Sequence, residues 1–251
     1  MLAANAMSAP TPIFSIIVVC KNPGPRIQAA LDSLHGQQGS EPEIIVIDGA
    51  STDGTCEWLE ALRPRLGTLI SEPDRGVYDA MNKGLAQARG EWVLFLGADD
   101  RLASPAVLQE AQALLQGNPA EIAVGEIRYD DGRIYRLNSR INPSARNFVH
   151  HQGAFYRRTL FAQHGGFDAA LAIMADYDLN LRLWKKNARF APLPLHIAVC
   201  GSRGLSDAGT WRGYAEEIRV RHRHCSGPQS LPWDALSVAR YFRKKTLRFL
   251  K

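Results

Sequence analysis

The sequence lacks any apolar run long enough to cross a membrane. The longest run, near Ile13 to Cys20, is far short of the roughly 20 residues that a transmembrane helix needs. Residues 1–12 are rich in Ala, Pro and small polar residues, with neither a basic segment nor a long apolar one. This composition predicts a disordered leader and not a signal peptide. We therefore expect no part of the chain to span a bilayer.

Cysteine is also scarce, and its spacing includes no metal-binding pair. The four cysteines, Cys20, Cys56, Cys200 and Cys225, lie far apart. This favours reduced thiols in a cytosolic protein over a disulfide framework. Internal repeats and low-complexity linkers are absent as well. A chain of 251 residues, 45% of them hydrophobic, is long enough for one well-filled α/β domain with a small appendage.

Positive charge is concentrated in the tail of the chain. The formal net charge is +5, but residues 211–251 contain ten Lys or Arg and three Asp or Glu, so the tail carries +7 and the remainder −2. The tail is also periodic, with apolar residues on one helical face and basic residues on the other. The apolar face is Ala235, Ala239, Phe242, Thr246 and Phe249, and the basic face is Arg240, Lys244, Arg248 and Lys251.

This basic amphipathic helix has two interpretations. Either it packs on the domain with a solvated outer side, or it docks on an anionic membrane surface, where each basic residue contributes about 1 kcal/mol. Nucleic acid is not expected as a partner, because the sequence has no groove-reading helix motif and no aromatic-and-basic sheet surface.

Strand and helix patterns alternate over residues 13–116. Runs of β-branched and apolar residues predict strands, and apolar residues three and four apart predict helices. The predicted strands are Phe14–Cys20, Glu43–Asp48, a short one at Leu69–Ile70, and Trp92–Leu96; the predicted helices are Arg26–His35, one starting within Ser51–Thr55, Val77–Ala88, and one from Ser104 to Leu115. The alternation implies parallel βαβ units and a Rossmann-like, mostly parallel sheet flanked by helices.

The pattern changes after residue 116. A turn signal at Asp130-Asp131-Gly132 predicts a hairpin between Glu121–Tyr129 and Arg133–Leu137. Further on we expect a strand at Gln152–Tyr156, a helix at Ala175–Lys186, and an edge strand or loop around Pro192 and Pro194.

Two adjacent carboxylates, Asp99 and Asp100, follow the buried strand Trp92–Leu96. Open α/β sheets bind their ligands at the carboxyl ends of strands. One acid alone would be explained as a helix cap or as a partner of Arg101, but two caps are not needed. Because adjacent carboxylates repel each other, the pair favours a hard divalent cation that holds the phosphates of a diphosphate substrate.

Two more acids occupy positions at which a functional role competes with a local one. Asp48 ends the second predicted strand, so it either caps a turn or accepts a hydrogen bond from a nucleotide base. Asp176 opens the helix at Ala175, where an N-cap is the favoured interpretation on the residues alone and a general base is the alternative. His150 and His151 either contact an acceptor or, as we expect, are structural.

Polar residues are dense in the segment Glu72–Gly84. Asp79, Asn82 and Lys83 share one side of the predicted helix, which is either a solvated face or a ligand-binding one. Arg75, in the loop before the helix, is placed to reach a phosphate.

Together these segments resemble the inverting GT-A glycosyltransferases of family two, which build bacterial polysaccharides of the O-antigen, exopolysaccharide and colanic-acid type. The resemblance covers residues 13 to about 205 and rests on five motifs. They are Ser15–Val19, Ile44–Thr55, Glu72–Gly84, Phe95–Asp100 and Ala175–Leu179.

The resemblance implies roles for the acids. Asp48 matches the residue that reads the nucleotide base, and Asp99 matches the metal-bound acid of an Asp-X-Asp motif, with Asp100 beside it as a second ligand of Mg²⁺ or Mn²⁺. Gly97 stands where that motif has its first acid. Asp176 matches the catalytic base. Arg75, Asp79 and Asn82 belong to the motif that binds the nucleotide-diphosphate sugar.

The resemblance also implies an organisation and an activity. Residues 13–116 are then the nucleotide-binding half of a GT-A domain, residues 117–210 the acceptor-binding half, and residues 211–251 a helical tail. We expect inverting sugar transfer to a hydroxyl of a glycan, linked to polyprenyl diphosphate, at the cytoplasmic face of the cell membrane. A non-catalytic nucleotide-sugar-binding or scaffold protein is the alternative, and Gly97 is the residue that favours it. A sugar-phosphate nucleotidyltransferase is a third, for which Lys21–Arg26 is a weak match.

Overall fold

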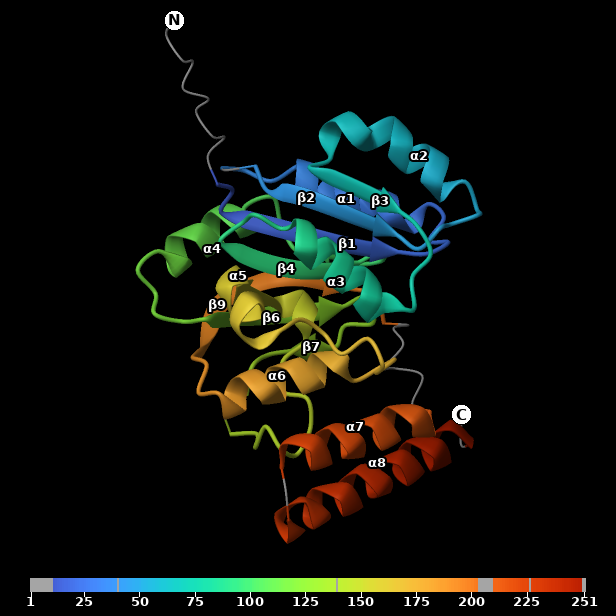
Figure 1. Cartoon of the computed structure of the whole chain (residues 1–251), viewed down its shortest axis with the longest axis vertical. Coiled ribbons are helices and arrows are strands. Elements are labelled where there is room, and N and C mark those ends of the chain that lie inside the picture. The colour runs from blue at the N-terminus through green and yellow to red at the C-terminus, as the bar shows by residue number, and fades with distance from the viewer. Residues whose placement is uncertain (1–10, 40, 139, 203–209, 226, 250–251) are drawn as a thin grey trace, which may run out of the picture.

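A mixed sheet of nine strands runs through the centre of the part of the chain that the structure describes (Figure 1). The computed structural model describes residues 11–39, 41–138, 140–202, 210–225 and 227–249, with the side chains of 247–249 left out. The strand order is β3-β2-β1-β4-β8-β6-β9-β5, and β7 pairs with β6. Of the predicted leader, residues 1–10 lie outside the described residues.

The first half of the sheet is parallel, as the alternation of patterns predicts. β1 pairs with β2 and β4, and β2 pairs with β3, all in parallel. The strands are β1 (Phe14–Cys20), β2 (Glu43–Asp48), β3 (Thr68–Ser71) and β4 (Trp92–Gly97). The helices between and after them are α1 (Arg26–His35), α2 (Thr55–Leu62), η1 (Arg63–Arg65), α3 (Val77–Gln87) and α4 (Val107–Leu115).

The second half adds antiparallel strands to the same sheet. β8 is antiparallel to both β4 and β6, and the predicted hairpin forms between β6 and β7. Its strands are β5 (Arg101–Leu102), β6 (Ile122–Tyr129), β7 (Ile134–Tyr135), β8 (Ala154–Arg157) and β9 (Phe190–Cys200). Its helices are η2 (His151–Gly153), α5 (Arg158–His164) and α6 (Ala175–Lys185). Neither β5 nor α5 was among the predicted elements.

The proline-containing segment forms the first part of β9. β9 pairs in parallel with β6 along its length, but on its other side only Ala198 and Val199 pair, with β5. Among the described strands, the stretch with Pro192 and Pro194 therefore has one neighbour, β6, so of the two predicted alternatives the edge strand is the one that forms.

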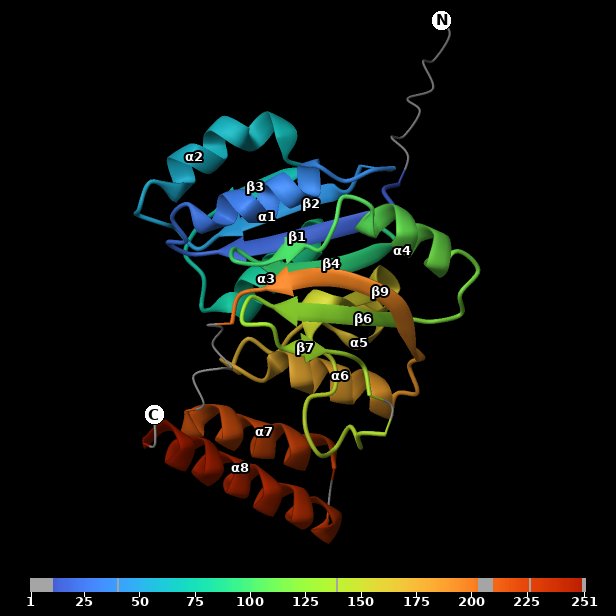
Figure 2. The same cartoon turned by 180° about the vertical axis from the view of Figure 1, so that it is seen from behind.

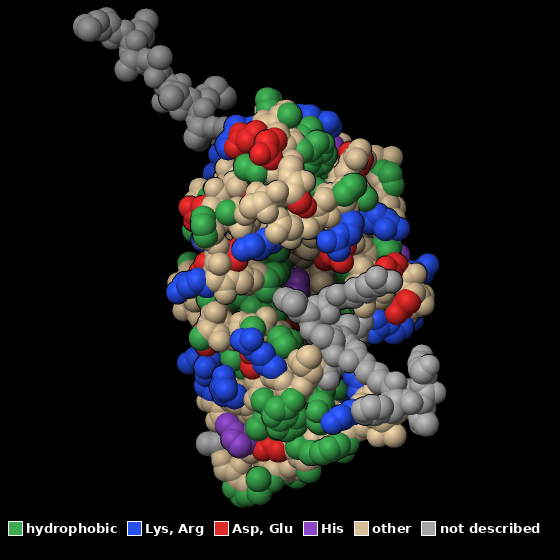
Figure 3. All heavy atoms as spheres, turned by 90° about the vertical axis from the view of Figure 1, so that its right-hand side faces the viewer, with side chains coloured by type: hydrophobic (Ala, Val, Ile, Leu, Met, Phe, Trp, Pro, Cys, Tyr) green, Lys and Arg blue, Asp and Glu red, His purple; other side chains and the backbone are tan. Residues whose placement is uncertain are grey.

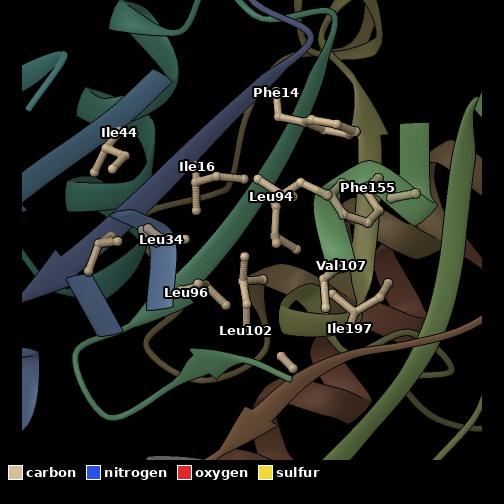
Figure 4. Close-up of a cluster of buried hydrophobic side chains, with 14 of the residues drawn as sticks. Phe14, Ile16, Leu34, Ile44, Leu94, Leu96, Leu102, Val107, Phe155 and Ile197 are labelled. Carbon is tan, nitrogen blue, oxygen red and sulfur yellow. The ribbon is translucent and has the colours of Figure 1, made fainter. Parts of the chain in front are cut away.

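Two buried apolar clusters cover the two faces of the sheet. Alternate residues of β1 point to opposite faces, so that Ile16 and Val18 belong to one cluster and Ile17 and Val19 to the other. The first cluster packs the strands against α1, α2 and α4, and Figure 4 shows Ile16, Leu34 and Leu94 within it. The second packs them against α3, α5 and α6. Because both faces are covered, the central strands read as continuous apolar runs.

The tail forms two helices beside α6, α7 (Trp211–His224) and α8 (Leu231–Phe249), with η4 (Pro228–Ser230) before α8. α7 packs against α6, and α8 lies along the outer side of α7 (Figures 1 and 2). Among the described helices, none combines the length and the apolar character that crossing a bilayer requires.

α8 packs on α7, and its orientation shows which of its two faces is the outer one. Arg240 turns inward and pairs with Glu217 of α7, whereas Phe242 is 58% exposed and Ala235, Ala239 and Thr246 of the predicted apolar face are exposed as well. The side chains of Arg248, Phe249 and Lys251 lie outside the described residues. The helix is amphipathic as predicted, but its apolar face is the outer one.

Two helical glycines should respond to alanine in opposite ways. At Gly84 in α3 a Cβ would lie 2.5 Å from Cγ2 of Ile17, whereas at Gly213 in α7 its nearest neighbours are 3.7–3.8 Å away. Overpacking costs about 1–3 kcal/mol, and helix propensity returns at most about 1 kcal/mol. We expect Gly84→Ala to lower the free energy of unfolding in urea and Gly213→Ala to leave it unchanged or raise it. The same effect for both variants would contradict this packing.

Candidate functional site

The carboxyl ends of the parallel strands meet at one edge of the sheet. Cys20 is in register with Asp48, and Val19 is in register with Gly97, two residues before Asp99. Figure 3 views this edge and shows a hollow with acidic side chains and a histidine at its wall. The predicted acids of β2 and β4 therefore lie at the same end of the sheet, where such folds bind ligands.

Asp48 is buried and accepts hydrogen bonds from the loop that follows it and from β3. Its Oδ2 accepts hydrogen bonds from the backbone N–H of Ser51 (2.9 Å) and from the hydroxyl of Ser71 (2.7 Å), and its Oδ1 accepts one from the Ser51 hydroxyl. Burial raises the pKa of Asp48, but these hydrogen bonds outweigh it and hold the pKa below its ordinary value. The carboxylate thus stays charged and shapes the loop after β2. Its contact with a base stays a prediction.

Asp99 and Asp100 have different surroundings although they are adjacent. Asp100 is buried, and it accepts hydrogen bonds from the backbone N–H groups of Gly97 (2.7 Å) and Gly201 (3.3 Å). Burial raises the pKa of Asp100. Asp99 is exposed and lies against Gly201, where a side chain would collide with its carboxylate. Asp99 is therefore the acid that is open to a ligand.

A metal site made of protein ligands alone is not seen among the described residues. They contain no group of three or more His, Cys, Asp or Glu side chains arranged to hold an ion. The roles of Asp99 and Asp100 as metal ligands stay predictions.

The polar residues of the motif Glu72–Gly84 mostly hold the loop before α3. Arg75, with 80% of its side chain exposed, pairs with Asp79 through Nη2 and Oδ1 at 2.7 Å. Hydrogen bonds from Arg75 lower the pKa of Asp79. Lys83 binds Glu72 at 2.7 Å and the carbonyl of Pro73 at 2.7 Å. Of this set, Arg75 presents the most accessible charge.

Asn82 connects α3 to the second half of the chain. Its Nδ2 donates to the carbonyl of Phe167 (2.8 Å), and its Oδ1 accepts the N–H of the same residue (2.9 Å). Both the oxygen and the nitrogen of the amide are therefore hydrogen-bonded to the backbone of Phe167. The position of Asn82 on the predicted helix did not indicate this contact. Its predicted role in donor binding remains untested.

Asp176 is held by side chains from two other segments and by a backbone N–H of its own helix. Its Oδ1 accepts the N–H of Tyr177 (2.8 Å) and the hydroxyl of Tyr78 (3.3 Å), and its Oδ2 accepts the amide of Asn147 (2.8 Å). Burial raises the pKa of Tyr78, so its phenol remains a donor. The N-cap of α6 is Met174, so the expectation that Asp176 caps the helix is wrong.

His151 lies beside Asp176 and belongs to η2, which packs against β4. Its Nδ1 is 3.6 Å from Oδ2 of Asp176 and has no hydrogen-bond partner among the described residues. A charge on its ring would also lower the pKa of Asp100. Asp176 and the strand β4 thus both lie beside η2, which begins at His151. His150, in contrast, shares a hydrogen bond with Tyr129 and packs on Tyr135.

Sequence reasoning missed Tyr78 and Asn147 and expected His151 to be structural. Tyr78 belongs to the motif Glu72–Gly84, so its position beside Asp79 is the one signal that was present. Asn147 lies in an irregular segment without periodicity, and it reaches Asp176 across 29 residues of chain.

A cavity of about 320 Å³ lies between the starts of α1 and α2, apart from these acids. It is lined by Gly24, Pro25, Ile27, Gln28, Asp53, Gly54, Thr55 and Trp58. Neither Asp176 nor the acids at the strand ends line it, so the cavity is not the site at which the acids meet.

The fold and the site define a class. A parallel first half that shares one sheet with a mixed second half, with helices on both faces, is typical of the GT-A fold. Solved structures share this fold. The chain superposes on Staphylococcus aureus TarS (residues 1–349) with a TM-score of 0.68 and 23% identity, over 92% of this chain and 72% of that one. It superposes on the mannosyltransferase PcManGT of Pyrobaculum calidifontis, in complex with GDP-Man and Mn²⁺, with a TM-score of 0.61 and 24% identity, over 92% and 75%.

Sequence comparison gives the family. The model of glycosyl transferase family 2 matches residues 15–177. A PGL/p-HBAD biosynthesis glycosyltransferase of Mycobacterium bovis is 34% identical over 197 residues, 75% of each chain. The succinoglycan biosynthesis protein ExoO of Rhizobium meliloti is 30% identical over 190 residues, 67% of this chain and 54% of that one. The chain belongs to glycosyl transferase family 2 and is a glycosyltransferase of glycan biosynthesis.

Replacement of Asn82 by Asp should destabilise the fold. The carboxylate keeps an acceptor for the N–H of Phe167 but places a charge against the Phe167 carbonyl, and a buried unsatisfied group costs about 1–3 kcal/mol. Asp79→Asn on the same helix is the control, because it breaks an exposed pair worth at most about 1 kcal/mol. Urea unfolding measures both. If Asn82→Asp leaves the free energy of unfolding unchanged and alters only the affinity for the donor, then Asn82 contacts the donor and does not stabilise the fold.

Proposed function

We propose that the protein transfers a sugar, with inversion, from a nucleotide-diphosphate sugar to a hydroxyl of a glycan acceptor. The observation that carries this proposal is the setting of Asp176. Its carboxylate is largely buried, is aligned by Tyr78 and Asn147, and lies near His151, whose helix η2 packs against β4. A base must be held within hydrogen-bond reach of the proton that it removes, and these contacts restrict its orientation.

In the proposed reaction Asp176 accepts the proton of the acceptor hydroxyl. The hydroxyl oxygen forms a bond to the anomeric carbon of the donor sugar, while the bond from that carbon to the diphosphate oxygen breaks on the opposite side. The electron pair leaves with the nucleoside diphosphate. A single displacement inverts the anomeric centre. Tyr177 and Asn147 each donate one hydrogen bond to Asp176, and Tyr78 shares its single proton between Asp176 and the closer carbonyl of Ile173, so the carboxylate keeps at least one free acceptor site.

The donor site that we propose combines the acids of the strand ends with Arg75. Asp79 orients the exposed guanidinium of Arg75 toward solvent, where a phosphate is accessible to it. Asp48 and its loop lie where the base is expected. TarS has been solved with UDP-GlcNAc and PcManGT with GDP-Man. Since the two fold neighbours carry different bases, UDP- and GDP-sugars are both candidate donors.

Asp99 would hold a divalent cation at this site. Mg²⁺ is commonly bound by one or two carboxylates together with substrate phosphates, and an exposed carboxylate at the strand edge fits that use. Such an ion neutralises the charge that develops on the leaving diphosphate. Asp100, engaged by the amides of Gly97 and Gly201, keeps the turn that presents Asp99. PcManGT, which was solved with Mn²⁺, supports the choice of ion.

Donor hydrolysis tests the activity without knowledge of the acceptor. With Mn²⁺ present, we expect slow release of nucleoside diphosphate from one member of a panel of UDP-, GDP- and dTDP-sugars. Asp176→Asn should reduce this release at least about 100-fold, because it removes the base. The thermal shift produced by the donor should persist in the variant.

Three outcomes separate the alternatives. Loss of donor affinity in Asp176→Asn would show that Asp176 is structural. A donor that binds to the wild-type protein without any turnover would favour the non-catalytic binding protein, and turnover that survives in Asp176→Asn would contradict the proposed base.

We further propose that α8 docks the enzyme on an anionic membrane at the cytoplasmic face, where lipid-linked acceptors are accessible. Leu231, Leu236 and Phe242 are 61%, 42% and 58% exposed on this helix. Exposed Arg243 and Lys245 flank Phe242. An exposed apolar stripe edged by cations suits a surface of hydrocarbon and anionic headgroups.

Vesicle flotation tests the docking surface. Full-length protein should float with vesicles of anionic phospholipid, and Leu236→Ser with Phe242→Ser should weaken binding at least about tenfold, because each buried apolar side chain contributes about 1.5–3 kcal/mol. Leu114→Ser in α4 is the matched control, since Leu114 is 38% exposed on another face. Equal flotation of all three proteins would exclude α8 as the contact.

A further inference from the structure

The segment that leads into Asp176 is held from outside by α7. The carboxylate of Glu216 accepts three consecutive backbone N–H groups, those of Ala172 (3.2 Å), Ile173 (2.8 Å) and Met174 (3.1 Å). Glu216 is itself buried. A single carboxylate that binds three successive amides restricts the path of this backbone, and Asp176 follows two residues later.

The same segment is attached to α3 on its other side. The hydroxyl of Tyr78 donates to the carbonyl of Ile173 at 2.7 Å and lies 3.3 Å from Oδ1 of Asp176. Any displacement of residues 172–174 would therefore change the relation between Asp176 and Tyr78. The position of the carboxylate depends on Glu216 through the backbone and through this phenol.

α7 also holds a second segment that contacts Asp176. The buried guanidinium of Arg221 donates to the carbonyls of Ser144 (Nε, 2.7 Å) and Ala145 (Nη2, 3.1 Å). Two residues further on, Asn147 donates to Oδ2 of Asp176 at 2.8 Å. The two backbone segments on either side of the acid thus converge on one helix.

Charge makes the Glu216 contact strong. Burial raises the pKa of Glu216, but the three backbone N–H groups outweigh it and the pKa stays below its ordinary value. The side chain is therefore ionised at neutral pH, and its hydrogen bonds are charge-assisted. Arg212, one turn earlier, pairs with it at 3.1 Å.

We infer that Glu216 is a positioning residue for the reaction: through the amides of residues 172–174 it sets the orientation of Asp176, so that α7 is part of the catalytic machinery. This inference rests on the proposed role of Asp176 as the base. The match to the family model ends at residue 177, before α7 begins. The helix that completes the site is therefore outside the segment that defines the family.

Glu216→Gln tests the inference. Glutamine has nearly the same shape but offers one acceptor and places an NH₂ group against the backbone amides. We expect kcat for donor hydrolysis to fall by about 10- to 100-fold, since a small misplacement of a reacting group costs that much. KM for the donor and the donor-induced thermal shift should stay unchanged. Glu216→Asp keeps the charge and should lose less activity.

Glu43→Gln provides a matched control. Glu43 is another buried glutamate that accepts hydrogen bonds, from Ser15 and Arg89, and it lies in the parallel half of the sheet away from Asp176. Its replacement should lower stability with kcat unaffected. Thermal melts establish that each variant is still folded at the assay temperature. If Glu216→Gln is unfolded there, Glu216→Asp replaces it as the test variant.

Coupling to the acid separates positioning from a general loss of stability. In the Asp176→Asn background, Glu216→Gln should cause no further loss of the residual hydrolysis, because the group that it orients is gone. Multiplicative losses would overturn the inference, as would an unchanged kcat in a folded Glu216→Gln protein. If Asp176→Asn itself leaves hydrolysis intact, the proposed base fails instead, which is a distinct outcome.

Discussion

The parallel pairing of β1 with β2 and β4 is the constraint on which the rest of the structure depends. It brings Asp48 and the acids after Gly97 to one edge although they are far apart in the chain. In this register the hydroxyl of Ser15, buried in β1, has two partners: it donates to Glu43 at 2.5 Å and accepts the N–H of Gly90 at 2.8 Å. A slip of one residue would leave this hydroxyl in apolar surroundings without partners, which is costly.

α3 extends this edge to the second half of the chain. Its inner face packs on the sheet at Gly84, and its polar residues reach across to the segments that precede and begin α6. Asn82 binds the backbone of Phe167, and Tyr78 binds the backbone of Ile173. α3 therefore contacts both the parallel strands that end near the acids and the segment that leads to Asp176. This explains why the segment Glu72–Gly84 is dense in polar residues although few of them are freely exposed.

Periodicity predicted most elements because their apolar residues are local signals. The bounds of β1, α1 and β2 follow directly from such runs. β5 was not predictable in this way, because its two residues become a strand only by pairing with Ala198 and Val199 of β9. The contacts that orient Asp176 could not be predicted from local patterns for the same reason. Its partners Tyr78 and Asn147 lie 98 and 29 residues away in the chain.

The tail shows what periodicity cannot decide. An amphipathic pattern separates two faces but does not say which face packs, and in α8 buried ionic contacts decide it. Arg221 is fully buried and bonds to Glu217 and Asp234, while Arg240 also pairs with Glu217. Removal of one member of such a cluster leaves an uncompensated charge at a cost of about 3–5 kcal/mol. Together with the ring contacts of Tyr241 on Trp211 and Tyr214, this cluster holds one side of α8 against α7 and leaves the side with Phe242 outward. The cluster that orients α8 also holds the segment of Asn147, so the exposed surface and the acid site share one structural support.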